Sequence, residues 1–280
     1  NAAAWCARQD PLTEQELTEV VFVTREVDEL LWIFQGLQVA LPKGVDRSLK
    51  VLTSGNTLGR DDADEVSARD YQYELRVASY FLQAGYECDM STEADLIVTI
   101  PAGRVFVECK RLKSEKQVRR RAKEASRQLT RRLRPLSFRA GYYGLALFDI
   151  TKIVHPGLGM TWSNDALDAS DGLRAELSRF DATYDFTRTI PWHSRVLSIS
   201  LQILCPNFNL GLQPIGTHFS GLHCTMLPSG GPRVEAFAQI RKAFDAHRIR
   251  KDEWPVQHQP PPGALLVPLR SSVVMPSDLK

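Results

Sequence analysis

Two apolar runs joined by a short turn predict a pair of strands in the first half of the chain. They lie in residues 93–112, EADLIVTIPAGRVFVECKRL, on either side of a turn at 101–103. Because side chains alternate along a strand, Glu108 and Lys110 project from one face and Cys109 projects from the other. Charged residues therefore stand at the end of a strand whose other positions indicate burial.

The rest of the pattern predicts helices and strands that follow one another along the chain. Apolar residues at helical spacing predict helices at 13–41 (one or two helices), 68–84, 114–133, 165–180 and 233–249. Apolar runs predict strands at 142–150 and 196–205, the second extending the same sheet. The order predicts an α/β fold, a central mixed sheet flanked by helices.

The chain divides into four segments on this basis. A polar stretch ends the first segment, and six prolines mark the last. We expect an N-terminal helical segment and linker (1–66), a core (67–150), an α/β extension packed on the core (151–253) and a proline-rich tail (254–280).

Capping boxes and one misplaced charge refine the helices. Thr13 with Glu16, and Ser114 with Gln117, have the spacing of capping boxes at helix N-termini. Glu74 falls inside the apolar arc of the helix at 68–84, whose other face carries Gln72, Arg76, Ser79 and Gln83. A carboxylate in that arc must be paired, bind a cation or reach solvent at the edge. A salt bridge to an arginine of the next helix and a functional role are both compatible with it.

Composition excludes several classes of protein. The chain has 280 residues, 43% of them hydrophobic and 24% charged, as in a globular protein. It contains no membrane-length apolar run and no secretory signal, so we expect a cytoplasmic protein without a membrane partner. Five widely spaced cysteines indicate neither a disulfide framework nor a zinc site. No glycine-rich phosphate loop follows a strand, which predicts that this chain binds no nucleotide cofactor.

Charge is strongly segregated, although the net charge is only +2. Residues 1–65 carry six basic and twelve acidic side chains, whereas residues 104–139 carry fourteen basic and three acidic ones. A basic helix at 114–133 suits a polyanion such as DNA, and an ordinary solvated helix face explains the same pattern. The candidate nucleic-acid contacts are Lys113, Arg119, Arg121, Gln128 and Arg132.

A second carboxylate, Asp95, lies at the head of the first strand of the hairpin. A loop of two or four residues brings Asp95 to the face of Glu108, and a three-residue loop does so only with a bulge. Two carboxylates can hold Mg²⁺ or Mn²⁺, with the backbone carbonyl of Cys109 as a further ligand. Lys110 can orient a water or offset charge in phosphodiester hydrolysis. The competing interpretation is a strand that ends in charge because it has reached solvent.

These residues resemble the PD-(D/E)xK motif of the restriction-endonuclease-like nucleases. Asp95 matches the motif aspartate, Glu108 the variable acid and Lys110 the lysine; Glu74 resembles the first-helix glutamate of the subset similar to archaeal Holliday junction resolvases. Gln128 adds a weaker resemblance. Ala94 stands where the motif has proline, and only residues 85–90 can supply the first strand of the family's core.

The resemblance covers residues 68–150 and implies a restriction-endonuclease-like core with extra N-terminal helices and a C-terminal extension. It also implies a metal-dependent nuclease, acting on DNA, with Asp95, Glu108, Lys110 and Glu74 in the catalytic site. The alternative is a catalytically silent nucleic-acid-binding or assembly module of the same fold. The acidic N-terminal helices suit a protein partner or a homodimer.

Overall fold

The computed structural model describes residues 13–54, 68–155, 161–163, 166–209, 217–226 and 231–252. The expected proline-rich tail and most of the expected linker lie outside these ranges. The helices are α2 (Glu14–Val39), α3 (Val45–Ser54), α4 (Ala68–Gln83), α5 (Glu115–Leu133), α6 (Thr151–Val154), α7 (Ala166–Tyr184), α8 (Phe186–Thr189) and α9 (Pro232–Asp252). The strands are β1 (Glu87–Asp89), β2 (Leu96–Ile100), β3 (Gly103–Arg111), β4 (Tyr142–Asp149), β5 (Thr161–Ser163), β6 (Val196–Asn209) and β7 (Thr217–Met226).

The strands form one seven-stranded mixed sheet in the order β1-β2-β3-β4-β6-β5, with β7 paired to β6. β1, β2 and β3 pair antiparallel, whereas β4 runs parallel to both β3 and β6. The predicted α/β class and mixed sheet are therefore confirmed. The strand predicted at 196–205 does extend the same sheet, and β1 lies within residues 85–90, the stretch available for a first strand.

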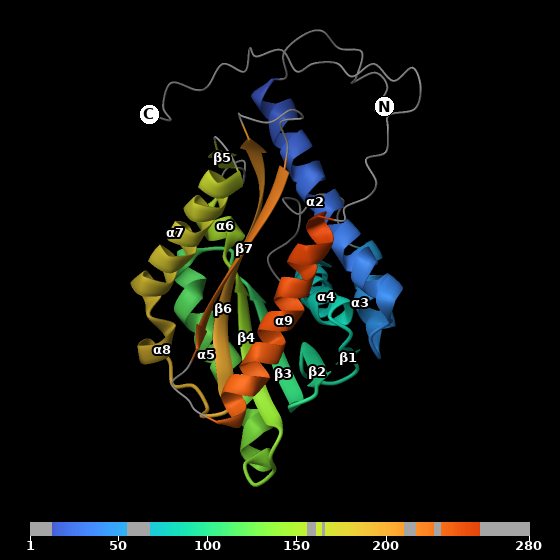
Figure 1. Ribbon diagram of the computed structural model, residues 1–280. Helices are drawn as coiled ribbons and strands as arrows, with labels where there is room; N and C mark the ends of the chain where they lie inside the picture. The colour runs from blue at the N-terminus through green and yellow to red at the C-terminus, as the bar shows by residue number, and fades with distance from the viewer. Residues whose placement is uncertain are drawn as a thin grey trace.

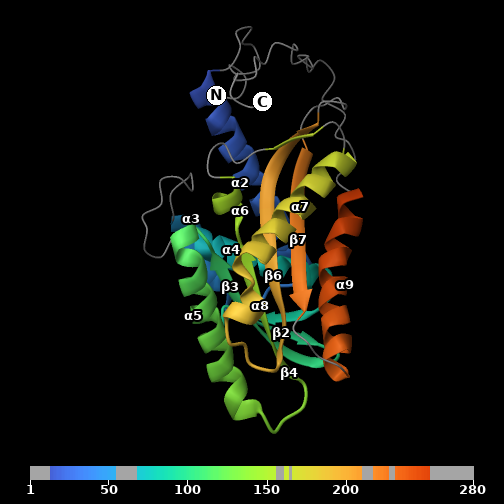
Figure 2. The ribbon, with the colours of Figure 1, turned by 90° about the vertical axis from the view of Figure 1, so that its left-hand side faces the viewer.

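Helices cover both faces of the sheet, and the alternation of β3 decides which side chains meet which layer. Val105, Val107 and Cys109 pack in the core shared with α4 and α9, whereas Phe106 packs against the core shared with α5 and α7. Figure 2 shows α5 and α9 on opposite sides of the strands, and Figure 1 shows α2 and α3 outside α4. Glu108 and Lys110 belong to the α5 side of β3 by the same alternation.

The sequence pattern did not predict several of the helices and strands. The missed elements are short or weakly apolar: α3, α6, α8, β5 and β7. The capping box at Thr13 and Glu16 is confirmed, with both reciprocal hydrogen bonds present. The one predicted at Ser114 is wrong: Ser114 is the N-cap, but its side chain makes no capping bond, and the Gln117 amide oxygen instead accepts from the backbone N–H of Lys113 at 3.3 Å.

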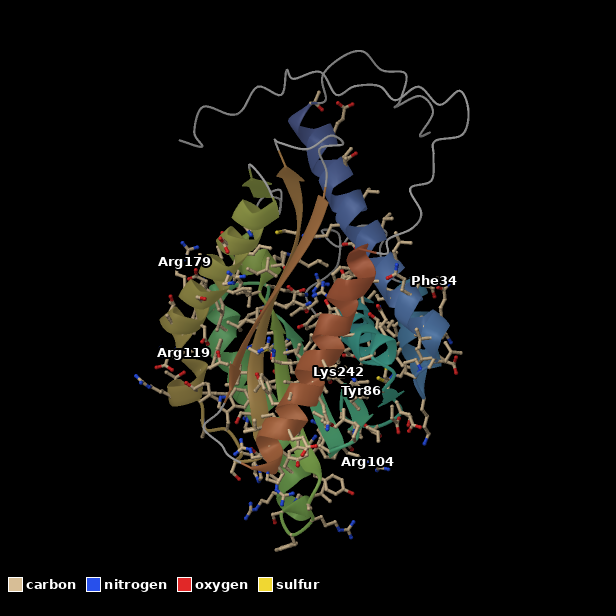
Figure 3. All side chains as sticks on the ribbon, viewed as in Figure 1. Phe34, Tyr86, Arg104, Arg119, Arg179 and Lys242 are labelled. Carbon is tan, nitrogen blue, oxygen red and sulfur yellow. The ribbon has the colours of Figure 1, made fainter. Side chains whose placement is uncertain are left out.

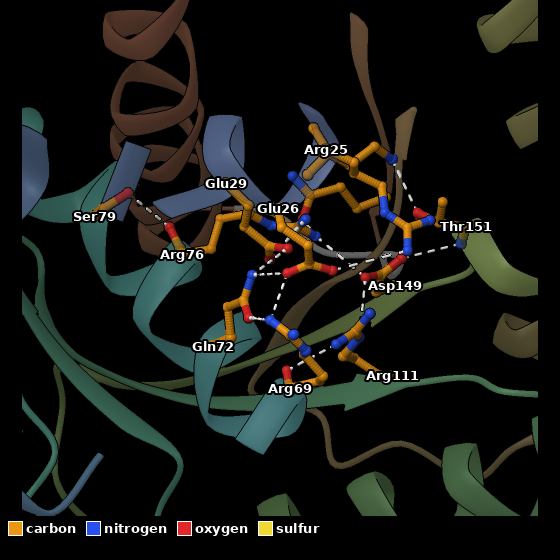
Figure 4. A network of polar contacts seen from close by, with 12 residues as sticks. Arg25, Glu26, Glu29, Arg69, Gln72, Arg76, Ser79, Arg111, Asp149 and Thr151 are labelled. Atoms are coloured by element: carbon orange, nitrogen blue, oxygen red, sulfur yellow. Dashed lines mark hydrogen bonds and ion pairs between the residues drawn. The ribbon is translucent and has the colours of Figure 1, made fainter. Parts of the chain in front are cut away.

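The polar face of α4 is buried, although the amphipathic pattern predicts one buried face only. Gln72, Arg76 and Ser79 are fully enclosed because α2 and the sheet cover this side of the helix. Arg76 makes ion pairs with Glu29 of α2 at 3.1 Å and Asp149 of β4 at 3.4 Å, and donates to Gln202 of β6 at 3.2 Å. Figure 4 shows this network, which joins the N-terminal helix to the centre of the sheet.

Candidate active site

The β2–β3 hairpin brings Asp95 beside Glu108. Ile100 pairs with Gly103 and Leu96 pairs with Val107, so two residues connect the strands and the next position outward joins Asp95 to Glu108. This is one of the registers that put both carboxylates on one face. The resulting position lies at the end of β3 nearest the start of α5.

The Lys110 ammonium lies between the two carboxylates. Its Nζ donates to Asp95 Oδ2 at 3.1 Å and to Glu108 Oε2 at 3.3 Å. The backbone N–H of Cys109 donates to the same Asp95 oxygen at 2.8 Å, which fixes the orientation of that carboxylate. Asp95 and Glu108 thus lie within hydrogen-bonding distance of one cation, the Lys110 ammonium.

Burial affects the pKa values of the charged side chains in this cluster. Glu108 has no exposed side-chain surface, and Lys110 is 10% exposed. Burial, and then the Asp95 carboxylate, raise the pKa of Glu108 to about 7, against the opposing effects of Lys110 and Arg132. Burial alone would lower the pKa of Lys110, but the Asp95 and Glu108 carboxylates hold it above its ordinary value. The ammonium therefore stays charged, whereas Glu108 depends on nearby cations to remain ionised.

Arg132, one of the candidate nucleic-acid contacts, is the second cation on Glu108. The Arg132 guanidinium binds the other oxygen of Glu108 and the backbone carbonyl of Glu93, and its side chain is only 10% exposed. The helical wheel identified the flank on which Arg132 lies, but the wheel contains no information about the strand opposite it. Arg132 therefore belongs to the carboxylate cluster.

Glu74 reaches the same cluster from α4. Burial raises the pKa of Glu74 to about 8, and the Asp95 and Glu108 carboxylates add to the shift while Lys110 opposes it. Within the described residues, Glu74 makes no ion pair with an arginine of α5, so the salt-bridge interpretation is not the arrangement found. One turn earlier on α4, burial also raises the pKa of Asp70, a residue that the sequence analysis did not single out.

Asp95 and Glu108 supply the type of ligand that a small divalent cation prefers. Mg²⁺ commonly uses one or two carboxylates and completes its shell with waters and substrate oxygens. One cation, the Lys110 ammonium, already lies within hydrogen-bonding distance of Asp95 and Glu108 together. Among the described residues, no group of three or more His, Cys, Asp or Glu side chains is arranged to hold a metal by itself. The Cys109 thiol packs in the core, so only its backbone carbonyl remains a candidate ligand.

The basic helix α5 keeps the apolar stripe that the sequence predicts and presents cations on its opposite face. Val118, Ala122, Ala125, Leu129 and Leu133 are fully buried. Arg119 is exposed and points away from the sheet in Figure 3. Arg121 instead pairs with Glu124 at 3.1 Å, and Gln128 and Lys113 are half-buried. The exposed cations of this helix are Lys116, Arg119, Arg120, Lys123, Arg127 and Arg131.

Comparisons with protein-family models, curated proteins and solved structures found no match to this chain. Among the described helices, none combines the length and apolar character needed to cross a bilayer.

Proposed function

We propose that the protein is a metal-dependent nuclease that hydrolyses phosphodiester bonds in DNA. The observation that carries the proposal is the Lys110 ammonium shared by the carboxylates of Asp95 and Glu108, at 3.1 and 3.3 Å, in a largely buried site. Buried carboxyl groups next to one another either hold a proton or need a cation to balance their charge. Asp95 and Glu108 are the two carboxylates that would hold Mg²⁺ or Mn²⁺, whose charge would balance theirs.

Each residue of the cluster then has a distinct role. Asp95 and Glu108, with the Cys109 carbonyl, would hold the metal ion, which when bound supplies Lewis-acid polarisation of a phosphoryl oxygen and acidifies a water. Lys110 keeps its proton and presents a fixed positive charge to the phosphate oxygens. Arg132 keeps Glu108 ionised and oriented. Glu74, held close by α4, can orient a water through its carboxyl group.

The arrangement of elements supports a restriction-endonuclease-like core as the finer fold proposal. α4, β1, β2, β3, α5 and β4 follow the order helix, three strands, helix, strand that the PD-(D/E)xK resemblance implies. The acids stand at the start of β2 and on β3, where the motif requires them. In this proposal the exposed cations of α5 bind the phosphate backbone of the substrate.

The test is cleavage of circular and linear DNA with Mg²⁺ or with EDTA. We expect Asp95→Ala and Glu108→Ala to lose both metal binding and cleavage. Lys110→Ala should lose cleavage but keep much of the metal affinity, measured by calorimetry, because lysine acts on phosphate and water. Glu93→Ala is the matched control, since this neighbouring carboxylate is 87% exposed and points at Arg131.

Cleavage that persists in EDTA, or in Asp95→Ala, would refute the mechanism. Tight DNA binding without cleavage in any metal would instead favour the silent binding module. That result assigns the Lys110 cluster a structural role.

A further inference from the structure

The connection between α5 and β4 exposes a single large aromatic side chain. Phe138 is 92% exposed, more than any other large apolar side chain in the described residues. We call residues 134–141 the Phe138 loop. Figures 1 and 2 both show this connection at the lower end of the molecule, beyond the ends of the neighbouring elements. A single exposed apolar side chain is common on protein surfaces, so the role of Phe138 has to be argued from what holds the loop and from the charges around it.

The side chain of Arg195 holds the loop in place, and Phe138 stays exposed to solvent. The guanidinium of Arg195 donates to the backbone carbonyls of Leu136 at 3.0 Å and Ser137 at 2.6 Å, and also to that of Arg139. Backbone bonds from Ser137 N–H to Arg134 and from Arg139 N–H to Leu136 tighten the same turn. One side chain thus fixes the carbonyls on both sides of Phe138.

The far end of the loop is anchored to the hairpin that carries the candidate active site. The backbone N–H of Arg104, near the start of β3, donates to the Gly141 carbonyl at 2.7 Å. A Cβ on Gly103 would lie 2.1 Å from that oxygen, so only glycine permits this approach. The near end follows the last turn of α5, where Arg132 contacts Glu108. The loop is therefore fixed at one end to the start of β3 and at the other to α5, the two elements that carry Glu108 and Arg132.

The charge around Phe138 is exclusively positive along the chain. Arg134 and Arg139 are exposed within the loop, which contains no acidic residue. The exposed cations of α5 lead up to it from the other direction. An aromatic ring between cations is the usual composition of a surface that binds single-stranded or distorted nucleic acid, where arginines bind phosphate and a base stacks on the ring.

We propose that Phe138 stacks on an unpaired or unstacked base, and that the preferred substrate is therefore DNA with such a base, at a fork, a bulge or a single-stranded end. The inference rests on the proposed function and specifies its substrate class. The favourable step is the burial of the ring against a base while Arg134 and Arg139 bind the adjacent phosphates. A uniform duplex offers phosphates but no open base face, so it uses the arginines alone.

An anionic membrane surface is the other partner that an aromatic residue and arginines can suit. Membrane insertion generally takes a set of apolar side chains on one face. In the Phe138 loop, Leu136 is half-buried and Phe138 is the only large apolar residue that stands free. The composition therefore favours a nucleic acid, and vesicle binding becomes an outcome of the test.

The experiment measures binding of labelled DNA to the full chain in EDTA, so that cleavage does not interfere. A forked duplex is compared with a fully paired duplex of the same length. We expect the wild type to prefer the fork, and Phe138→Ala to weaken fork binding by roughly 5- to 150-fold, the range of one base–aromatic stack. The same change should leave binding to the paired duplex nearly unaltered, and Phe138→Trp should retain the preference.

Phe34→Ala is the matched control, because Phe34 is a phenylalanine 62% exposed on α2, away from the basic helix. Arg134→Gln with Arg139→Gln should weaken binding to both DNAs alike, since phosphate contacts carry no information about base pairing. Equal affinities of wild type and Phe138→Ala for the fork would overturn the proposal. So would binding of wild type to phosphatidylserine vesicles that Phe138→Ala loses, with DNA binding unchanged.

The two proposals fail separately. A Phe138-dependent preference for the fork without metal-dependent cleavage keeps the stacking role and rejects the nuclease. Metal-dependent cleavage that Asp95→Ala abolishes, with no effect of Phe138→Ala on fork preference, does the reverse.

Discussion

In the carboxylate cluster, burial of a residue opposes the charge that its side chain can carry. Glu108 is fully enclosed, yet it contacts two cations, Lys110 and Arg132. Glu74 has no such contact among the described residues, and its pKa of about 8 shows that its neutral form is favoured over much of the physiological range. Glu74 is therefore the residue at which pH should act most directly on the metal-free protein.

We predict that Glu74→Gln stabilises the metal-free protein at pH 9 but not at pH 5. A carboxyl whose folded pKa is raised contributes stability that is fully present below its ordinary value of 4.5. That contribution is lost as the pH rises through about 8, when the buried group must ionise. The amide has the shape of the neutral acid and does not titrate. Differential scanning calorimetry of both proteins at the two pH values measures the difference.

Glu93→Gln, which changes an exposed carboxylate, provides the comparison for this experiment. It should shift the melting temperature little at either pH. An equal effect of Glu74→Gln at pH 5 and pH 9 would show that its carboxyl is not titrating in a buried site.

At the scale of elements, α5 presents two groups of cations on different sides. Its apolar stripe packs on the sheet, Arg132 turns inward to the carboxylate cluster, and the remaining exposed arginines face outward. A helix of this kind can steer a polyanion while it braces the site, because the two groups of cations occupy different arcs.

We predict that Arg119→Gln with Arg120→Gln flattens the salt dependence of duplex binding by about two units of log–log slope, near 0.9 for each phosphate that no longer meets an arginine. The measurement is fluorescence anisotropy over a range of salt concentrations, in EDTA. Arg179→Gln with Lys242→Gln removes two exposed cations on α7 and α9 (Figure 3) and should leave the slope unchanged. Arg132→Gln should likewise spare the slope while it impairs metal binding. If the slope is the same in wild type and in the Arg119→Gln, Arg120→Gln variant, these arginines are solvated and do not contact phosphate.

At the scale of the whole molecule, buried charges tie the N-terminal helices to the sheet. Arg76 on α4 is 1% exposed and contacts Glu29 of α2 and Asp149 of β4. A second pair, Arg69 with Glu26, joins α4 to α2. Arg111, next to Lys110 on β3, contacts Asp149 at 3.5 Å and the Arg69 carbonyl at 3.0 Å. The network therefore runs from α2 to the strand that carries the candidate active site.

We predict that Arg76→Ala lowers the free energy of unfolding by about 3–5 kcal/mol, because it leaves Glu29 and Asp149 buried without their shared partner. Urea denaturation measures this change. Arg76→Ala with Glu29→Gln and Asp149→Asn should recover part of the loss, since the uncompensated charges are then removed. A cost below about 1 kcal/mol for Arg76→Ala would mean that water reaches the site.

Local pattern in the sequence determined the elements that pack by a regular stripe. The helices of α4, α5, α7 and α9 and the strands β2, β3, β4 and β6 follow directly from periodicity, because each buries one face or both faces along its length. Alternation also determined that Glu108 and Lys110 share a face. The acids and the lysine of the candidate site could therefore be identified from the sequence, although their geometry could not.

Only the tertiary structure decided which partners those residues meet. The hairpin register placed Asp95 beside Glu108, and helix packing brought Arg132 onto Glu108. The enclosure of the polar face of α4 depends on Glu29 and Asp149, which lie far from Arg76 in the sequence. Periodicity reports which face of an element is apolar, but the burial of a charge depends on the opposite charges that distant segments bring to it.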